Sequence, residues 1–361
     1  MRTDMTELKN PTGPITPRRF SNGKFLMTVF ADSQRFPDLH GFEMRDPYWI
    51  VAGWEGMEDV AGGGERKTIV WSQPEILLYA LPPCEDLRCG IGYPDFIETA
   101  AGEIYLTETD KKDSRVHHLP GTMLEMMWNQ SAISERPSRG LTLALPKHTA
   151  NIESTRGNHG QQSLPQSVTA PSFGNLSAGD GFTVELVLDT TKLPTKTPLS
   201  IDLFDCRTAA RNTSHGLKRQ GVALRFSNIA DDGRGDGMVA PAYTVELMIT
   251  DGAGRNQSYH TDAEARLWLQ QEHHITTIVD GFSRTITSVT NGVFADGGNA
   301  RGQGWAHLGS IPNIAGEGDI EVADGARSCS IHPAVTSLRA YDRFLLTTEA
   351  IGSWRAWKAG R

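Results

Sequence analysis

Cysteine is scarce in this sequence, and long apolar runs are missing. The 361 residues contain four cysteines, Cys84, Cys89, Cys206 and Cys329. None of them forms a Cys-x-x-Cys pair, which excludes the commonest zinc-binding motifs. Cys84 and Cys89 are close enough in one loop for a local disulfide, and two free thiols are the alternative. No apolar run is long enough to cross a bilayer, so we expect no membrane span.

The first residues lack an apolar secretory segment, because Met1–Gly13 is charged and polar. The sequence therefore predicts no compartment, and secretion or display at the cell surface is expected only if the gene encodes a signal upstream. Nucleic acid is excluded as a partner, since the formal net charge is −8. An anionic sugar is compatible with this charge if one pocket is locally basic.

Long helical patterns are also scarce, whereas turn-forming residues are abundant. The chain has 37 Gly and 19 Pro, and 38% of it is hydrophobic, which favours an all-β chain with buried cores. Alternating segments separated by Asp-Gly and Asn-Gly turns predict an antiparallel β-sandwich of the jelly-roll type in the second half. These segments are Phe182–Leu188, Gly221–Phe226, Tyr243–Ile249, Ile275–Val279 and Val335–Tyr341. We expect two domains, residues 1–148 and 179–361, joined by a linker at 149–178.

The stretch Trp71–His118 carries the main functional pattern. It contains the segments Trp71-Ser72-Gln73-Pro74, Tyr93-Pro94-Asp95-Phe96 and Leu106-Thr107-Glu108. Its short runs are bounded by Gly, Pro or Asp, which is typical of the antiparallel strands of a propeller blade. A phenol at Tyr93, beside the Asp95 carboxylate and facing cations, can act on an anionic ligand.

These segments resemble the last catalytic segment of sialidases, where Trp-Ser-Glu-Pro is followed by Tyr-Ser-Asp-Leu and Leu-Tyr-Glu. The resemblance implies a partial β-propeller of the sialidase (neuraminidase, BNR) superfamily in residues 1–148. Of the family's Asp box only the Trp end, Trp71, is present. The resemblance also implies an exo-acting, retaining hydrolase of sialylated or other acidic glycans, with Tyr93 as nucleophile and Glu108 bracing an arginine. A phenol suits this chemistry because a carboxylate nucleophile would be repelled by the anionic substrate.

The candidate substrate-binding residues are Arg18, Arg19, Arg45 and Asp95. Arg45 precedes the predicted strand Tyr48–Ala52, where the sialidase resemblance implies an arginine of the carboxylate-binding triad. A guanidinium can hold a carboxylate through two parallel hydrogen bonds. The alternative is that Arg45 pairs with a neighbouring acid at the rim. Arg18 and Arg19 stand at the opening of the first predicted strand, and a solvated surface pair is the alternative for them.

The chain before the linker is short for a propeller. About 130 residues are enough for roughly two to three blades, and no aspartate upstream of Arg45 is a candidate for the general acid. We therefore expect the C-terminal part of a sialidase-like enzyme, incomplete by itself, whose exposed blade edges favour either the missing blades or self-association. A non-catalytic carbohydrate-binding or adhesion protein is the second hypothesis. A propeller glycosidase acting on another acidic sugar is the third.

The second domain resembles laminin-G-like and concanavalin-like domains through the motif Leu338-Arg339-Ala340-Tyr341-Asp342-Arg343 and the strand before Asp280-Gly281. The resemblance implies a fold, and it leaves open whether the domain binds sugar or packs on a catalytic domain. No cofactor is expected. Asp251, Asp262 and Asp296 lie in predicted loops as candidate Ca²⁺ ligands, with simple turn formation as the alternative.

Overall fold

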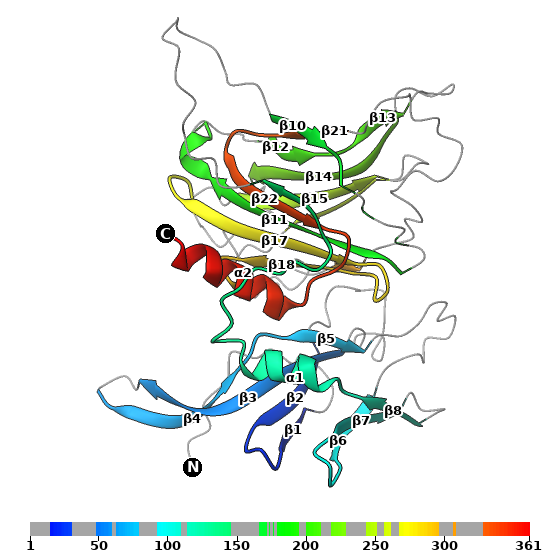
Figure 1. The fold of residues 1–361 in the computed structure, drawn as a ribbon, viewed down its shortest axis with the longest axis vertical. Coiled ribbons are helices and arrows are strands. Elements are labelled where there is room, and N and C mark those ends of the chain that lie inside the picture. Colours follow the sequence, from blue (N-terminus) through cyan, green and yellow to red (C-terminus); the bar gives the residue numbers. More distant parts are fainter. Residues whose placement is uncertain are drawn as a thin grey trace, which may run out of the picture. The chain divides into compact units, whose positions relative to one another are not determined.

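The computed structural model divides into two compact units. One comprises Met1–Arg136 with Leu346–Arg361, and the other comprises Pro137–Leu345. The structure describes residues 15–30, 48–59, 63–78, 92–109, 114–145, 166–171, 173, 176, 179–194, 200–210, 218–228, 243–250, 256–260, 267–295, 306–307 and 328–361. Antiparallel sheets dominate both units (Figure 1). The predicted all-β class is therefore confirmed.

The first unit contains two antiparallel sheets and two helices in its described residues. Its strands are β1 (Thr16–Arg19), β2 (Phe25–Phe30), β3 (Tyr48–Asp59), β4 (Glu65–Trp71), β5 (Glu75–Leu78), β6 (Gly92–Glu98), β7 (Ile104–Thr109) and β8 (Ser114–His118). Its helices are α1 (Gly121–Trp128) and α2 (Thr347–Ala359). One sheet has the order β1–β2–β3–β4, with β5 also paired to β3, and the other has the order β6–β7–β8.

A short turn fixes the register of β1 and β2. Asn22 and Gly23 form the hairpin turn, and Gly23 has φ 78°, a left-handed conformation that glycine adopts without strain. The backbone N–H of Phe20 donates to the carbonyl of Lys24 at 2.9 Å. Arg19 therefore lies opposite Phe25 in the pairing of the two strands.

The two sheets of the first unit share one apolar core. Phe20 and Phe96, one from each sheet region, meet edge to face with ring centroids 5.9 Å apart. A short helix after Pro120, α1, also contributes to this core and buries Leu124 and Met127. This core places β6–β8 against the first sheet by one face only, so the residues of the opposite face, including Tyr93, are exposed.

The second unit is a sandwich of two antiparallel sheets. Its elements are β9 (Leu141–Leu145), β10 (Gln166–Thr169), β11 (Gly181–Asp189), η3 (Thr190–Lys192), β12 (Ser200–Asp205), β13 (Thr208–Ala210), β14 (Lys218–Asn228), β15 (Tyr243–Thr250), β16 (Asn256–His260), β17 (Glu272–Asp280), β18 (Thr285–Thr290), β19 (Val293–Phe294), β20 (Ala306–His307), β21 (Ser328–Ile331) and β22 (Val335–Tyr341). One sheet has the order β10–β21–β12–β14–β15–β16, with β13 on β14. The other has the order β19–β18–β17–β11–β22–β9, with β20 on β18.

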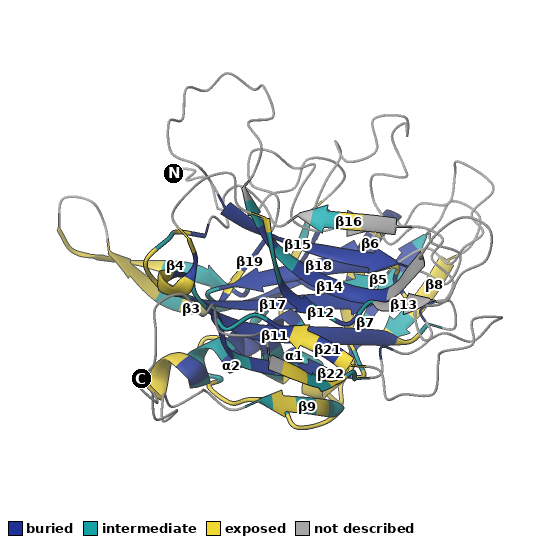
Figure 2. Ribbon diagram, turned by 90° about the horizontal axis from the view of Figure 1, so that it is seen from above, coloured by how far each residue is buried: buried dark blue, intermediate teal, exposed yellow. Residues whose placement is uncertain are grey.

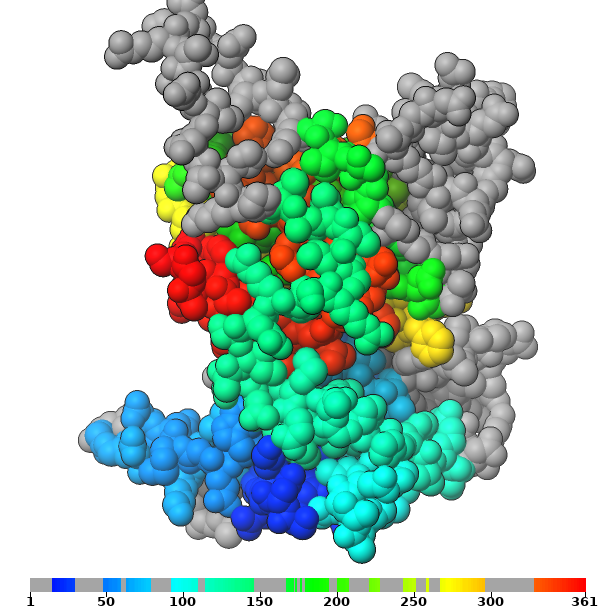
Figure 3. Space-filling view, in the orientation of Figure 1, coloured from blue at the N-terminus to red at the C-terminus, as the bar shows by residue number. Residues whose placement is uncertain are grey.

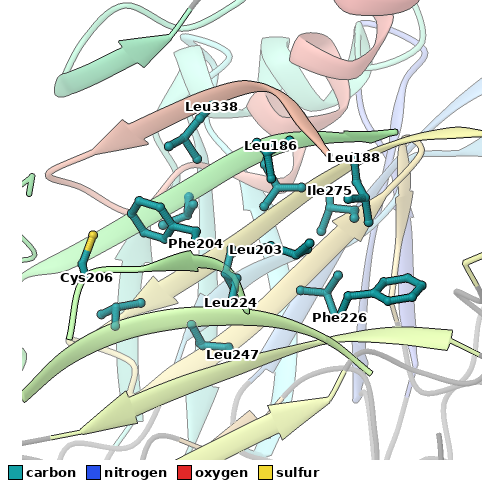
Figure 4. Packing of buried hydrophobic residues seen from close by; sticks show 14 of the residues in the cluster. Leu186, Leu188, Leu203, Phe204, Cys206, Leu224, Phe226, Leu247, Ile275 and Leu338 are labelled. Carbon is teal, nitrogen blue, oxygen red and sulfur yellow. The ribbon is translucent and has the colours of Figure 1, made fainter. Parts of the chain in front are cut away.

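Strict alternation builds the core of the sandwich. Leu186 and Leu188 of β11 point between the sheets, where they meet residues such as Leu224 and Phe226 of β14 (Figure 4). Glu185, the residue before Leu186, faces the other side of the sheet and is also buried. Strands β11, β14 and β17 are buried along most of their described length (Figure 2).

A disulfide between Cys206 and Cys329 crosslinks the second unit. The two cysteines are 123 residues apart, one just after β12 and the other in β21, and these strands are neighbours in one sheet. The sequence offered no pairing for them, because connectivity cannot be deduced from spacing alone. Cys84 and Cys89, the pair considered for a local disulfide, lie outside the described residues.

Two segments lie in a different unit from the predicted domain that contains them. β9, within the predicted residues 1–148, pairs with β22 of the sandwich. α2, within the predicted residues 179–361, belongs to the first unit. Glu75 holds it there, because the fully buried carboxylate accepts hydrogen bonds from the backbone N–H groups of Thr347 at 2.8 Å and Thr348 at 2.7 Å. The predicted boundaries at 148 and 179 stay a prediction.

Candidate functional site

Strands β6, β7 and β8 carry the sequence-predicted catalytic residues at the surface of the first unit, in the cyan part of Figure 3. Tyr93 is the second residue of β6 and is 60% exposed. Its φ of 47° is unusual for a residue other than glycine, and the pairing of β6 with β7 shifts register between Gly92 and Asp95. The exposed phenol therefore lies at a bulge. Backbone strain of this kind is concentrated at functional sites.

Glu108 lies in the middle strand, β7, and its side chain is 1% exposed. Its Oε1 pairs with Nε of Arg115 and lies 3.3 Å from Nε2 of His117, both on the neighbouring strand β8. Arg115 stands directly opposite Glu108 in the β7–β8 register. The other oxygen, Oε2, is buried and has no hydrogen-bond partner in the structure. A buried carboxylate therefore anchors an arginine that is itself 43% exposed.

Tyr93 and Glu108 are not brought together as a nucleophile and its base. On β6, Tyr93, Asp95 and Ile97 are exposed while Phe96 is buried, and on β7 the buried face contains Leu106 and Glu108. The phenol thus lies on the solvent face of the sheet, and the carboxylate lies on the face that packs against the core. Among the described residues, Oε1 of Glu108 contacts Arg115 and His117 of β8 and Oε2 makes no hydrogen bond, so neither oxygen is bonded to Tyr93.

The other predicted site residues form exposed ion pairs. Nη1 of Arg18 lies 3.4 Å from Oδ1 of Asp95, so these two predicted residues do meet. Arg19 pairs instead with Glu55 of β3 at 3.0 Å. Exposed pairs of this kind contribute about 0–1 kcal/mol to stability, and they separate easily in the presence of a competing anion. Arg45 lies outside the described residues.

The described residues contain no group of three or more His, Cys, Asp or Glu side chains that would hold a metal ion. The three calcium candidates, Asp251, Asp262 and Asp296, lie outside them. The helices that the structure describes are all too short or too polar to traverse a bilayer.

Arg115 and His117 are the residues of this site that sequence reasoning did not assign. The signal for Arg115 was present in the hairpin pattern, because two short strands that alternate in and out place residues on one face opposite each other. In the register of β7 and β8, Thr109 faces Ser114 and Glu108 faces Arg115. A glutamate opposite an arginine on adjacent strands predicts a cross-strand ion pair.

No protein-family model and no curated protein matches the chain. Among solved structures, the chain is similar to a Trypanosoma rangeli sialidase in complex with 2,3-difluorosialic acid, with 13% identity and a TM-score of 0.30, over 95% of this chain and 53% of that chain. It is also similar to the CBM40 of the Ruminococcus gnavus IT-sialidase bound to α2,6-sialyllactose, with 11% identity and a TM-score of 0.28, over 54% of this chain and 97% of that chain. The chain spans about half the length of the trypanosome sialidase. Similarity at this level does not assign a family, so the class defined here is an all-β protein with a two-sheet sandwich.

Proposed function

We propose that the chain is the C-terminal portion of a sialidase-like glycoside hydrolase that recognises sialic-acid-type, carboxylate-bearing glycans. In this proposal the sheets of the first unit are propeller blades, and the sandwich is an accessory lectin-like domain. The observation that carries the proposal is the pair of buried Glu108 and half-exposed Arg115. This pair is the arrangement that the resemblance to sialidases implies, an arginine braced by a glutamate.

Burial explains why this pair is suited to binding an anion. Removing a carboxylate from water costs several kcal/mol unless a positive charge compensates it, so Glu108 fixes the position of the Arg115 guanidinium strongly. The pairing uses Nε of Arg115. Nη1 and Nη2, at the other end of the planar group, can donate two parallel hydrogen bonds to the carboxylate of a sugar. A guanidinium that is already oriented loses less side-chain entropy when the ligand binds.

The exposed ion pair of Arg18 on β1 with Asp95 on β6 supplies a cation on the face of β6 that carries Tyr93, whereas Arg115 stands opposite Glu108. Arg45 completes the arginine set in this proposal, as the sialidase resemblance implies. Tyr93 is the proposed nucleophile, and its exposed phenol is accessible to a sugar ring.

Catalysis by this chain alone is expected to fail. A phenol acts as a nucleophile only with a base or cations close to its hydroxyl, and the Glu108 carboxylate lies on the other face of the sheet. We therefore expect binding without turnover, with the missing groups contributed by further blades or by an associated chain. A carbohydrate-binding protein that never hydrolyses its ligand fits the same geometry, and so does an enzyme acting on another acidic sugar.

The test measures binding of 3′-sialyllactose and lactose to the whole chain by titration calorimetry, together with hydrolysis of a fluorogenic sialoside. Arg115→Gln is expected to weaken 3′-sialyllactose binding about 10-fold or more, because a charge-assisted bidentate contact is lost. Arg66→Gln is the matched control, since Arg66 is equally exposed and forms a cross-strand pair with Glu58 at 2.8 Å in the β3–β4 hairpin.

Three outcomes would contradict the proposal. If Arg115→Gln binds 3′-sialyllactose as tightly as the unmodified chain does, Arg115 does not take part in binding. If the chain binds 3′-sialyllactose and lactose with equal affinity, the carboxylate of the sugar is not the group that is recognised. Turnover of the sialoside that Tyr93→Phe abolishes would show that the chain is complete, contrary to the expectation stated above.

A further inference from the structure

Trp268 presents an indole ring to solvent on the second unit. Its side chain is 52% exposed, although the residue before it, Leu267, is buried in the sandwich core. Trp268 begins the short turn that leads into β17, in which Gln270 has a left-handed φ of 66°. An exposed indole keeps a large apolar surface in contact with water, so a rigid turn that holds it there is of interest as a binding position.

Buried His273 contacts the backbone of this turn through its imidazole ring. Nε2 of His273 lies 2.9 Å from the carbonyl oxygen of Trp268, and Nδ1 lies 3.0 Å from Nδ2 of Asn291. Oδ1 of Asn291 accepts a hydrogen bond from the backbone N–H of His274, so its Nδ2 is the donor to Nδ1. Nε2 of His273 also lies 3.1 Å from the backbone nitrogen of Trp268, so the ring contacts both polar backbone atoms of that residue. Burial lowers the pKa of His273, which favours the neutral ring.

Thr190 fixes the same turn from the side. The hydroxyl of this fully buried residue lies 3.0 Å from the carbonyl of Trp268 and 2.7 Å from that of Gln271, and it accepts the N–H of Gln271 at 3.0 Å. The backbone N–H of Thr190 also donates to the Gln271 carbonyl at 3.0 Å. Both ends of the turn are thus anchored to side chains that cannot move freely.

We propose that Trp268 is a stacking platform for a pyranose ring, and that the second unit carries its own carbohydrate-binding site. An indole offers a flat apolar face with negative partial charge, and the C–H groups on one face of a pyranose are apolar with positive partial charge. Because the turn is already rigid, sugar binding does not have to order the protein. This site differs from the Arg115 site of the first unit, since stacking requires no carboxylate.

The groups beside Trp268 favour a sugar over an apolar partner. Gln270 and Gln271 of the same turn are exposed, and so are Thr191 and Lys192 of η3, which is linked to the turn through Thr190. Amide, hydroxyl and ammonium groups donate and accept hydrogen bonds with sugar hydroxyls. A protein-binding hot spot instead needs a wide apolar surround that excludes water.

The test uses three neutral probes, lactose, maltotriose and chitotriose, and measures their binding to the whole chain by saturation-transfer NMR titration. At least one probe is expected to bind, and Trp268→Ala is expected to weaken that binding about 10-fold or more. Trp268→Phe keeps a flat ring and is expected to retain most of the affinity. Phe282→Ala is the matched control, because Phe282 is an exposed aromatic residue, at 54%, in another turn of the same unit.

The proposal is overturned if none of the three probes binds, if Trp268→Ala binds as tightly as the unmodified chain, or if Phe282→Ala weakens binding to the same extent. Thermal melting of each variant verifies that it is folded, and an exposed side chain is not expected to shift the midpoint appreciably. Arg115→Gln is expected to leave the binding of these neutral probes unchanged. The two sites can therefore fail independently of each other.

Discussion

The stability of the first unit is expected to depend on the protonation of Glu75. Burial raises the pKa of this carboxyl from 4.5 to about 7, against the opposing effect of hydrogen bonds from Thr348 and Thr347. The two backbone N–H groups belong to the first turn of α2, whose N-cap residue Leu346 provides no side-chain acceptor. Glu75 therefore caps this helix from a residue about 270 positions earlier.

The sign of the effect follows from proton linkage. Between pH 4.5 and about 7 the folded protein holds a proton on Glu75 that the unfolded chain has released. The free energy of unfolding therefore falls as the pH rises through this window. A difference of about 2.5 pKa units corresponds to a loss of roughly 3 kcal/mol in the free energy of unfolding. This loss builds up across the window and does not grow further above the pKa of the folded protein.

Glu75→Gln should remove this slope, because the amide resembles the protonated carboxyl and does not titrate. The assay is urea unfolding of both proteins at pH 5, 6, 7 and 8, with hydrogen exchange of the Thr347 and Thr348 amides as a local readout. Burial lowers the pKa values of His273 and His332, so these groups give a slope of the opposite sign. Subtracting the two curves isolates the contribution of Glu75.

Glu349→Gln is a suitable control. Glu349 accepts the N–H of Leu346 at 2.9 Å at the same helix end, so its removal tests whether any loss at this cap changes the pH profile. Parallel curves for Glu75→Gln and the unmodified protein would refute the reasoning. A free energy of unfolding that rises more steeply with pH in the unmodified protein would refute it as well.

Two further predictions concern the second unit. Replacing Cys206 and Cys329 together by serine should lower its free energy of unfolding by about 4–5 kcal/mol, since the crosslink closes a loop of 123 residues, and an unchanged urea midpoint would contradict this. Tyr341→Phe should destabilise the unit by about 1–3 kcal/mol, because the hydroxyl lies 3.1 Å from the buried Glu185 carboxylate and 2.8 Å from Nε of Arg339. The loss should be measurable by thermal melting. The double variant with Glu185→Gln should lose less stability in total than the sum of the losses of the two single variants.

Local patterns in the sequence were sufficient to predict the strands and their turns. The alternation in Phe182–Leu188 and the Asn22-Gly23 pair act over neighbouring residues, and both correspond to the observed strand and hairpin. The register of β6 was less predictable, because a bulge between Gly92 and Asp95 shifts its pairing with β7 by one residue. A sequence does not reveal a shift of this kind, whereas the alternating burial along β6 and β7 is what places Tyr93 and Glu108 on opposite faces.

Contacts between distant residues were the other feature that the sequence did not supply. The disulfide of Cys206 with Cys329 and the capping of α2 by Glu75 join segments separated by more than a hundred residues. Each depends on which strands become neighbours in the folded sheets. Neither residue spacing nor hydrophobic period contains that information.

The three buried glutamates of the described residues clarify why Glu108 is the one assigned to ligand binding. Glu75 is used by backbone N–H groups of a helix, and Glu185 contacts His274 and Tyr341, both of them buried. Each of these carboxylates is compensated inside the protein, so each acts on stability. Glu108 is compensated by Arg115, whose side chain reaches solvent.

An anion that binds Arg115 would also experience the buried charge of Glu108 behind it. Replacing Glu108 should therefore change the affinity for a carboxylate-bearing sugar as well as the stability of the fold. Titrating 3′-sialyllactose into Glu108→Gln, Arg115→Gln and the double variant measures this coupling, and additive losses would argue that the two residues act independently.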